Sequence, residues 1–544
     1  MIRCFPQGLA FVLAGGFMLL ANGGCAPMTS ESSLSSELSA VVASGKAMAV
    51  FDLNLASPDD FAKVEQYFDV VGSGPSRQQV ILTRSQMEAL RDGTFTFPQG
   101  AGLTYNQDRT TDLLSVLEDG IPFGTSPEEL GNGVYLSLAA IETFFDQLQT
   151  RYPNRVEAHK YGESWEGRPL LAYRITADLN EAKPKAVFLA SSHAREISTP
   201  EMVVRLANYL LGQQDAWSQW VLQHREIWLI PVHNPDGRMK VENGFPLWKK
   251  NTHSQDQPCA LDETGKTDGV DLNRNFAWRW RNDSDSVCAS DYSGKSPASE
   301  PEVDALQKLL SSLFPSNRPQ DMSSSANPGL SGIFMNLHAF SEWVMAPWIG
   351  ETDPAPNEPN QVRIAESVAG LVGYDLVSLP YPAFGDANDW LYGMTGTPSI
   401  AMEIGTSFFE PADELQALFE RLLPGFRHTI DEAQRPYAPV LDAFQSTLEP
   451  KRNRLVLKNI SNEEVLVDGF AWNLPQVSLG LKQQGNNPCA LQQPFTLPPN
   501  TECTLAIEHT DDTPATNVLL ISSHNGSGML EIPVSMPSKK QKKN

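Results

Sequence analysis

The sequence predicts an α/β protein with a central sheet covered by helices on both faces, a small α+β unit before it and a β-sandwich after it. Three observations indicate this fold class. Short apolar strands alternate with helical patterns between about residues 134 and 437. A compact β-α-β-α pattern precedes them. Closely spaced strands between turn residues follow them.

The composition favours a folded protein that does not bind nucleic acid. Of 544 residues, 41% are hydrophobic and 19% are charged, which is enough apolar material for a sizeable core. The length suggests three or four domains at roughly 150 residues each. There are 41 Lys and Arg against 65 Asp and Glu, giving a net charge of −24. Because phosphate binding needs a basic face, this charge argues against a nucleic-acid partner.

The first residues predict an export signal. An apolar run from Leu9 to Leu20 follows an early charge at Arg3, and the run is too short to span a bilayer. Small residues before Cys25 resemble a bacterial lipoprotein signal, with ordinary cleavage nearby as the alternative. We therefore expect an exported protein, either secreted or lipid-anchored through Cys25 in the bacterial cell envelope, in the periplasm or at the outer membrane. No later stretch predicts a transmembrane helix.

The region before the central sheet predicts a small α+β domain. Strands are expected at residues 47–53 and 79–82, each followed by a helix. Ser57 can cap the first helix ahead of Pro58, and Gly93 can end the second. This unit resembles small ferredoxin-like domains.

The central region predicts buried strands at residues 186–190, 227–232, 333–337 and 399–404. Each is a short apolar run without strict alternation, which is typical of a sheet covered on both faces. Between the first two strands, an amphipathic helix is expected to start at Pro200 after a Ser or Thr cap.

The cysteines after the signal predict two disulfides. Cys259 and Cys288 form one local pair, and Cys489 and Cys503 form the other. Such pairing indicates an oxidising compartment, with buried free thiols as the alternative. The second pair lies among short strands separated by Asn, Gly and Pro turns, a pattern typical of an immunoglobulin-like β-sandwich.

Three side chains far apart in the sequence predict a metal site. His193 follows an apolar strand, and Glu196 opens the helix behind it. Imidazole and carboxylate are good zinc ligands, and a catalytic zinc takes three protein ligands and leaves a position for water. His338 ends another strand, where open α/β sheets place their sites. Each histidine alone would more often be a hydrogen-bonded core residue, so the wider pattern decides.

That wider pattern is a series of motifs in a fixed order. They are Gly162–Pro169, the His193 and Glu196 pair, Asn234–Gly237, Gly269–Phe276, Leu337–Ser341, Tyr381–Gly385 running into Asp389-Trp390, and Met402–Gly405. With them the chain resembles the zinc metallocarboxypeptidases of the carboxypeptidase A/B type. The resemblance implies a central mixed sheet of the eight-stranded type and hydrolysis of C-terminal peptide bonds with one zinc ion per chain.

The resemblance and the residue patterns together predict the domain organisation. In chain order we expect a lipoprotein-like signal peptide at 1–25, a flexible tether at 26–46, the ferredoxin-like domain at 47–105, a connector at 106–133, a zinc carboxypeptidase catalytic domain at 134–437, the β-sandwich at 438–536 and a basic tail at 537–544.

The resemblance also implies the roles of the chemical groups. His193, Glu196 and His338 would bind zinc, and Asp271 would hydrogen-bond the far nitrogen of His193 and fix its tautomer. Glu403 would be the general base, which takes a proton from the zinc-bound water and returns it to the leaving amine.

Substrate binding would fall to a second group of residues. Arg274 would pair bidentately with the free terminal carboxylate, helped by Asn273 and by the hydroxyl of Tyr381, which is counted with the catalytic residues. Arg195 would contact substrate further from the cut. Asn388 would help to form the base of the side-chain pocket.

The pocket and the oxyanion position are the least typical parts of the site. Asn388 is neutral, so apolar or mixed C-terminal residues are expected, while Asp386 nearby leaves basic residues open. Thr252 stands where the family usually has an oxyanion-stabilising Arg, and loss of such a donor can cost about 10²–10³ in rate. Lys249, Lys250, His253 or an arginine from elsewhere in the chain could replace it.

Three functions follow from these residues. The first is a zinc exopeptidase that acts on the C-termini of peptides and proteins. The second is a cell-wall peptide peptidase or an amidohydrolase of the same fold, for which Arg274 would not need a terminal carboxylate. The third is a catalytically inactive peptide-binding module, which the departure at Thr252 favours and the retention of Glu403 opposes.

Overall fold

The computed structural model describes most of the chain between residues 38 and 536. The gaps within this span are residues 47, 55–63, 65–68, 73–77, 94–101, 213–214, 255–258, 260–267, 283–285, 352, 379–382, 438–443, 450–453, 460–463, 468, 473–478, 486, 493, 510–514 and 524–527. The predicted signal peptide, Cys25 and the basic tail therefore lie outside the described residues.

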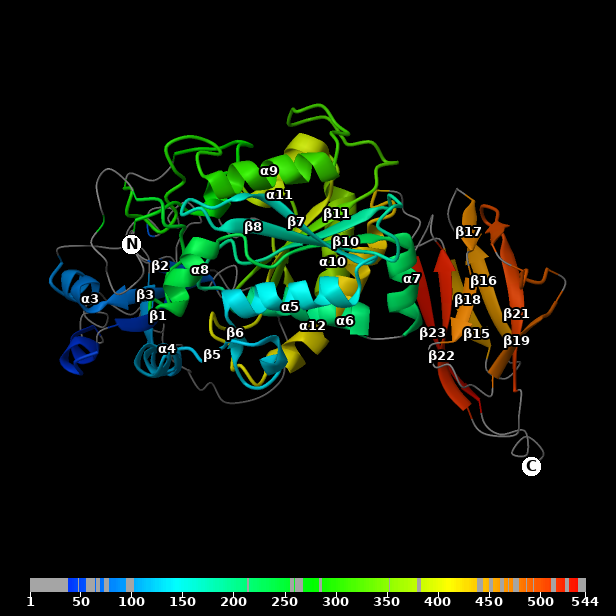
Figure 1. The fold of residues 1–544 in the computed structure, drawn as a ribbon, viewed down its shortest axis with the longest axis horizontal. Helices are drawn as coiled ribbons and strands as arrows, with labels where there is room; N and C mark the ends of the chain where they lie inside the picture. Colours follow the sequence, from blue (N-terminus) through cyan, green and yellow to red (C-terminus); the bar gives the residue numbers. More distant parts are fainter. Residues whose placement is uncertain are drawn as a thin grey trace, which may run out of the picture.

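The central region forms an eight-stranded mixed sheet, as predicted (Figure 1). Its strand order is β13-β12-β14-β11-β9-β10-β8-β7. The four inner strands, β14, β11, β9 and β10, run parallel. Strand β8 is antiparallel to both β10 and β7, and β12 is antiparallel to β14 but parallel to β13. The strands are β7 (Val156–Glu163), β8 (Pro169–Ile175), β9 (Lys185–Leu189), β10 (Glu226–Ile230), β11 (Ile333–His338), β12 (Trp343–Met345), β13 (Asp375–Leu376) and β14 (Ser399–Glu403).

Helices cover both faces of this sheet, because alternate strand residues bury opposite faces. Phe188 and Met335 pack with helices α5, α6, α7, α10 and α12, whereas Val187 and Phe334 pack with α9 and α11. The helices are α5 (Leu138–Arg151), α6 (Ser198–Gly212), α7 (Ala216–His224), α9 (Pro301–Leu313), α10 (Glu358–Val372), α11 (Ala387–Thr395) and α12 (Leu415–Glu432). This explains why the strands lack strict hydrophobic alternation in the sequence.

The N-terminal unit contains a four-stranded sheet in the order β2-β3-β1-β4. Its described elements are β1 (Met48–Asn54), β2 (Asp69–Gly72), β3 (Gln78–Thr83), α3 (Arg84–Arg91), β4 (Gly102–Asn106) and α4 (Gln107–Asp119). Thr83 caps α3 with a reciprocal capping box. The helix expected after Ser57 falls outside the described residues.

The structure corrects one sequence expectation before this unit and adds a helix to the segment after it. Residues 38–43 are helical rather than part of a flexible tether, and Leu38, Val41 and Val42 are buried in the same core as Phe51. Their spacing places them on one helical face, a signal hidden by the Ser- and Ala-rich composition. The expected connector likewise contains helix α4, whose Thr110 hydroxyl accepts a hydrogen bond from the Val50 amide (2.9 Å).

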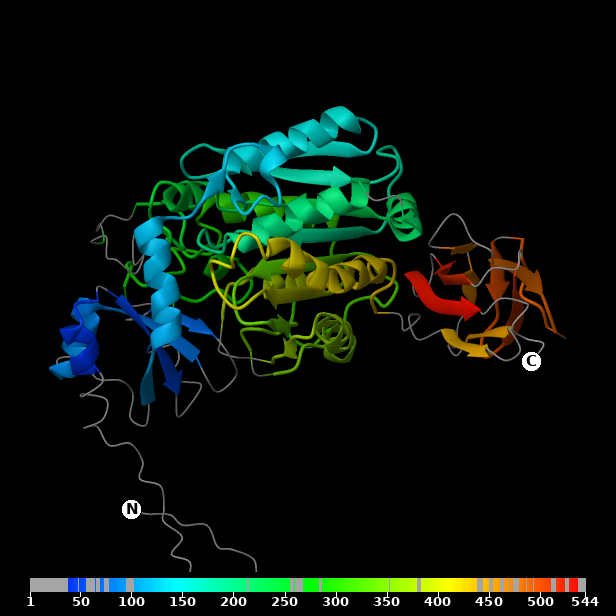
Figure 2. The same cartoon turned by 90° about the horizontal axis from the view of Figure 1, so that it is seen from below.

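The N-terminal unit and the C-terminal strands lie at opposite ends of the central region (Figures 1 and 2). On the N-terminal side, Val50, Ile81 and Leu113 form a buried apolar cluster with Leu247 and Phe408 of the central region. The N-terminal unit thus packs directly against loops that follow the central strands.

The C-terminal strands form three small sheets, in agreement with an all-β region. Their orders are β15-β16-β21-β19, β17-β20 and β18-β22-β23. The strands are β15 (Phe444–Glu449), β16 (Arg454–Asn459), β17 (Val465–Val467), β18 (Gly469–Trp472), β19 (Leu479–Gln483), β20 (Phe495–Leu497), β21 (Glu502–His509), β22 (Ala515–Ser523) and β23 (Gly528–Met536).

Both predicted disulfides are present. Cys259 is bonded to Cys288, and Cys489 is bonded to Cys503. The second bridge is buried in the core of the C-terminal sheets together with Leu505. Among the described helices, none is both long and apolar enough to cross a membrane.

Candidate active site

The parallel strands bring three predicted zinc ligands together at their carboxyl ends. His338 is the last residue of β11, and His193 and Glu196 lie in the loop between β9 and α6. The Glu196 carboxylate contacts both imidazoles: Oε1 lies 2.6 Å from His193 Nδ1, and Oε2 lies 3.0 Å from His338 Nδ1. All three side chains are buried, and one ligand atom of each lies within 4.8 Å of the others.

These residues fit a zinc ion. Two imidazoles and a carboxylate that converge within 4.8 Å are a donor set that zinc takes, at about 2.0–2.2 Å to each ligand atom. Burial would raise the pKa of Glu196, but the two imidazoles outweigh it and hold that pKa at about 2, so the carboxylate is ionised. His338 Nε2 is buried and has no hydrogen-bond partner among the described residues, which leaves its Nδ1 side to make the polar contact.

Asp271 lies behind His193, on the side away from the other ligands. Its Oδ1 is 3.0 Å from His193 Nε2 and also accepts the Asn273 amide at 2.9 Å. Its Oδ2 forms an ion pair with Lys249 Nζ at 2.9 Å. Burial opposes ionisation, yet Lys249 and His193 hold the pKa of Asp271 well below its usual range. An ionised Asp271 keeps the proton of His193 on Nε2, so that Nδ1 presents its lone pair to a metal.

Glu403 ends β14 directly beside His338. The two residues are register partners in the parallel pair of β11 and β14, so their side chains project from the same edge of the sheet. Burial raises the pKa of Glu403 to about 7, against the attraction of the His338 imidazole. A carboxyl group with this pKa can take and return a proton near neutral pH.

Arg274 and Asn273 lie in a short 3₁₀ helix, η2 (Leu272–Arg274), next to the start of α11. Asn273 Oδ1 accepts the Ala387 amide at 3.1 Å. Gly385 has a φ of 71°, and a Cβ there would lie 2.3 Å from the Arg274 carbonyl oxygen. Only glycine therefore lets this loop approach the backbone of Arg274 so closely. The side chain of Arg274 is itself largely buried.

Of the remaining predicted residues, Arg195 and Asn388 have contacts in the structure and Tyr381 is not described. The Arg195 guanidinium lies 4.3 Å from the centre of the Phe408 ring, against the loop that follows β14. Asn388 is buried in the first turn of α11 and accepts a hydrogen bond from Asn336. Tyr381 lies outside the described residues.

The three side chains considered as substitutes for the missing oxyanion Arg are engaged elsewhere. Lys249 pairs with Asp271, and Lys250 Nζ donates to the carbonyl oxygens of Val287 and Ala289. His253 Nδ1 lies 2.9 Å from a Glu300 carboxylate oxygen. Of the three, Lys249 is the one whose charge acts on Glu403.

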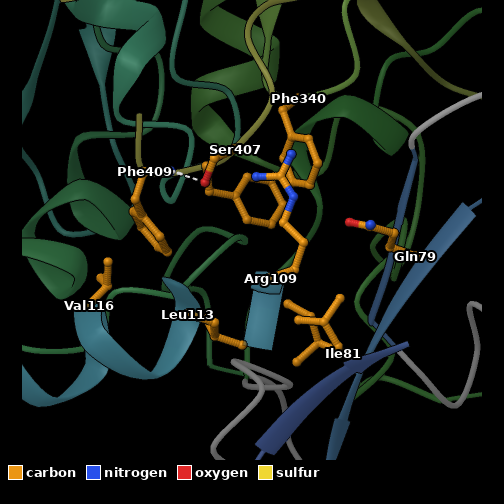
Figure 3. A pocket seen from close by; sticks show the side chains of 10 residues that line it. Gln79, Ile81, Arg109, Leu113, Val116, Phe340, Ser407 and Phe409 are labelled. Carbon is orange, nitrogen blue, oxygen red and sulfur yellow. Dashed lines mark hydrogen bonds between the residues drawn. The ribbon is translucent and has the colours of Figure 1, made fainter. Parts of the chain in front are cut away.

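A cavity of about 60 Å³ lies beside this site, between the N-terminal unit and the central region (Figure 3). Ile81 and Leu113 line it from the N-terminal unit, and Phe340 and Phe409 line it from the loops after β11 and β14. The guanidinium of Arg109 lies 5.8 Å from the centre of the Phe340 ring. The N-terminal unit therefore borders the loops that carry the predicted ligands.

Two contacts of the site were not predicted from the sequence: Lys249 with Asp271, and Asn336 with Asn388. The Lys249 partnership with Asp271 was missed because the two residues are separated by a loop whose path the local pattern does not give. Asn336 was missed although its place two residues before His338 puts it on the same face of β11. That alternation was the signal that could have found it.

Comparison with known proteins identifies the family of the chain. Residues 141–424 match the family model described as zinc carboxypeptidase. The chain is 25% identical to mouse carboxypeptidase A4 over 368 residues, which cover 63% of this chain and 82% of the mouse protein. It is 26% identical to zinc carboxypeptidase A 1 of Anopheles gambiae over 273 residues, which cover 48% of this chain and 57% of the mosquito protein.

A solved structure shows the same fold. Carboxypeptidase A from Helicoverpa armigera superposes with a TM-score of 0.58 at 20% identity, covering 71% of this chain and 97% of the insect protein. The fold and the buried His-Glu-His group define a metallopeptidase-type α/β protein. Since the family match spans more than half of the sequence, the chain belongs to the zinc carboxypeptidase family.

Proposed function

We propose that the protein is a zinc-dependent metallocarboxypeptidase that removes C-terminal residues from peptides or proteins. The observation that carries the proposal is the convergence of His193, Glu196 and His338 beside Glu403 at one edge of the sheet. Family membership supports the same class of enzyme. The relatives named above support the reaction class, while the individual residue roles remain part of the proposal.

Each side chain has a role in this proposal. His193, Glu196 and His338 hold the metal. Zinc in this position would polarise the scissile carbonyl and lower the pKa of a water molecule. Glu403 accepts the proton of the attacking water and delivers it to the departing amine, a task suited to its pKa of about 7. Asp271 acts as a positioning residue, because it orients His193 without touching substrate.

Substrate recognition is assigned to Arg274, Asn273, Arg195 and Tyr381. The planar guanidinium of Arg274 matches a terminal carboxylate bidentately, which would restrict cleavage to the last peptide bond. Support comes from its placement beside the start of α11, on the side of the sheet that carries the metal residues. Thr252 stands where the family usually has the oxyanion Arg, and Lys249, a possible substitute among the described residues, is paired with Asp271, so we expect slow turnover.

The proposal is tested with a blocked dipeptide that has a free carboxylate and with its amidated counterpart. The zinc-loaded protein should cleave the first and spare the second, and chelation should abolish cleavage. Glu403→Gln should retain zinc and lose turnover by at least about 10²-fold. Glu420→Gln, which changes an exposed carboxylate on helix α12, serves as the control and should retain activity. Cleavage of both peptides alike would instead favour the amidohydrolase alternative.

Export is proposed on separate grounds. The two disulfides are consistent with an oxidising compartment. Lipidation of Cys25 stays a prediction from the sequence.

A further inference from the structure

A pair of buried asparagines lies one layer below the metal residues. His338 pairs in register with Glu403, and two positions earlier Asn336 pairs with Ala401. Because side chains alternate along a strand, Asn336 and Ala401 face the same side of the sheet as His338 and Glu403. The strand rise separates the two layers by roughly 6.6 Å. Asn336 therefore lies on the floor beneath the proposed reaction centre.

Asn388 meets Asn336 from helix α11. Asn336 Nδ2 donates to Asn388 Oδ1 at 3.1 Å, and both residues are almost completely buried. The residue before Asn388 in the helix, Ala387, donates its amide to Asn273, the neighbour of Arg274. The Asn336–Asn388 pair thus lies next to the residues proposed to hold the terminal carboxylate.

The pair leaves two polar atoms unused. Asn336 Oδ1 and Asn388 Nδ2 are buried without a partner among the residues that the structure describes. An unpaired buried polar atom costs roughly 1–3 kcal/mol, so such atoms in a native protein call for a ligand or water. The number of free donors and acceptors does not depend on how the oxygen and nitrogen atoms of the two amides are assigned. One bond between two amides always leaves one carbonyl acceptor and one NH₂ donor.

This combination selects a chemical class of side chain. A carboxamide offers one donor and one acceptor and can satisfy both free atoms. A carboxylate offers acceptors alone, an ammonium or guanidinium offers donors alone, and an aliphatic group offers neither, while a hydroxyl carries its donor and acceptor on a single oxygen rather than on two separate atoms. Glutamine reaches further than asparagine, because its side chain has one more methylene. Ala401, the register partner of Asn336, contributes an apolar wall together with Met345 and Ile349.

A nearby acid makes a basic side chain the main competitor. Asp386 Oδ1 accepts the amides of Asn388 and Asp389 as the cap of α11, which directs charge at the positive end of the helix, whereas its Oδ2 is buried without a partner among the described residues. A preference for C-terminal Lys is therefore the outcome that the test below has to exclude.

We propose that Asn336 and Asn388 recognise the side chain of the terminal residue and make the enzyme selective for C-terminal glutamine. This inference rests on the proposed carboxypeptidase function and replaces the apolar or mixed preference expected from the sequence.

The test compares zinc-loaded full-length enzyme on blocked dipeptides that differ only in the last residue: Gln, Asn, Leu, Phe, Lys or Glu. Two hydrogen bonds to otherwise unpaired buried atoms should raise kcat/KM for Gln over Leu and over Glu by about 10- to 100-fold. Asn388→Leu should lower the Gln-to-Leu ratio to about one or less, and Asn388→Asp should shift the preference to Lys. Ratios within one preparation do not depend on how much of the protein is folded.

A matched control is Gln361→Ala in α10, which removes another buried amide with no partner within the described part of the chain. It should leave the Gln-to-Leu ratio unchanged. A wild-type ratio of one or less, a preference for Lys, or an unchanged ratio in Asn388→Leu would overturn the role of the pair while leaving the carboxypeptidase function intact.

A binding measurement separates the proposed carboxypeptidase function from the proposed recognition of glutamine by the Asn336–Asn388 pair. Calorimetry with the Glu403→Gln variant should show tighter binding of the Gln peptide than of the Leu peptide by about 10-fold or more. If no peptide is hydrolysed by the wild type but this difference in binding persists, the proposed function fails and the recognition by the pair stands. Equal binding of the Gln and Leu peptides would overturn the proposed role of the pair.

Discussion

Replacement of Asp271 by Asn tests whether the buried carboxylate holds the His193 imidazole in the tautomer that can bind a metal ion. Asp271 contacts His193 Nε2 at 3.0 Å and Lys249 Nζ at 2.9 Å, and it is fully buried. The variant keeps the shape of the side chain and removes its charge. The bond that fixes the His193 tautomer is then weakened, and Lys249 is left without its counter-ion.

Two effects of different size are expected. Removal of a carboxylate behind a metal-binding His typically costs 10–100-fold in metal affinity or activity, so the zinc dissociation constant should rise by about that factor, or about 1.4–2.7 kcal/mol. Loss of one member of a buried ion pair costs about 3–5 kcal/mol of stability, because the other charge stays buried. Zinc affinity is measured by competition with a chromogenic chelator, and stability by urea unfolding of the metal-free protein.

Lys249→Met separates these effects. The double variant, Asp271→Asn with Lys249→Met, should recover most of the lost stability, since no unpaired charge remains, but it should still bind zinc weakly. Lys249→Met alone should keep zinc affinity within a few-fold of the wild type, because Asp271 still accepts from His193. The reasoning is refuted if Asp271→Asn binds zinc as tightly as the wild type, or if the double variant binds zinc normally.

Three further predictions concern the loop beside Arg274, a buried imidazole and the C-terminal bridge. Gly385→Ala should displace Arg274 and lower kcat/KM by about 10²-fold with zinc content unchanged, and normal kinetics would contradict the packing argument. His233 is fully buried, and burial lowers its pKa to about 4. Between about pH 6.5 and 4 its imidazole is therefore neutral in the native state and protonated in the unfolded chain. The contribution of His233 to the stability of the metal-free protein should fall as pH drops from about 6.5 to 4, by up to about 3 kcal/mol, so over this range the free energy of unfolding of the wild type should decrease relative to that of His233→Gln by about that amount in urea unfolding; a constant difference between the two proteins would exclude the effect. Replacing Cys489 and Cys503 by Ser should destabilise the C-terminal sheets by about 3 kcal/mol in calorimetry and spare hydrolysis, whereas loss of activity would show that the sheets support the site.

The fold could be predicted to the level of its sheets and the order of its parts. Apolar strands without alternation indicated a sheet covered on both faces, and the strand ends at His193 and His338 indicated where ligands would meet. Composition was a poorer guide at the N-terminus. The Ser- and Ala-rich segment suggested a tether, while the helical spacing of Leu38 and Val41 decided the structure, because burial depends on which face residues share.

The sequence by itself determined the chemical groups of the site, since their identities and their positions after strands are local properties of the chain. The partnerships of Lys249 with Asp271 and of Asn336 with Asn388 were decided only by the tertiary structure. Each joins residues on separate elements, and their contact depends on strand order and helix placement rather than on any local pattern. The same is true of the N-terminal unit, whose packing beside Phe408 requires two separately folded surfaces to fit.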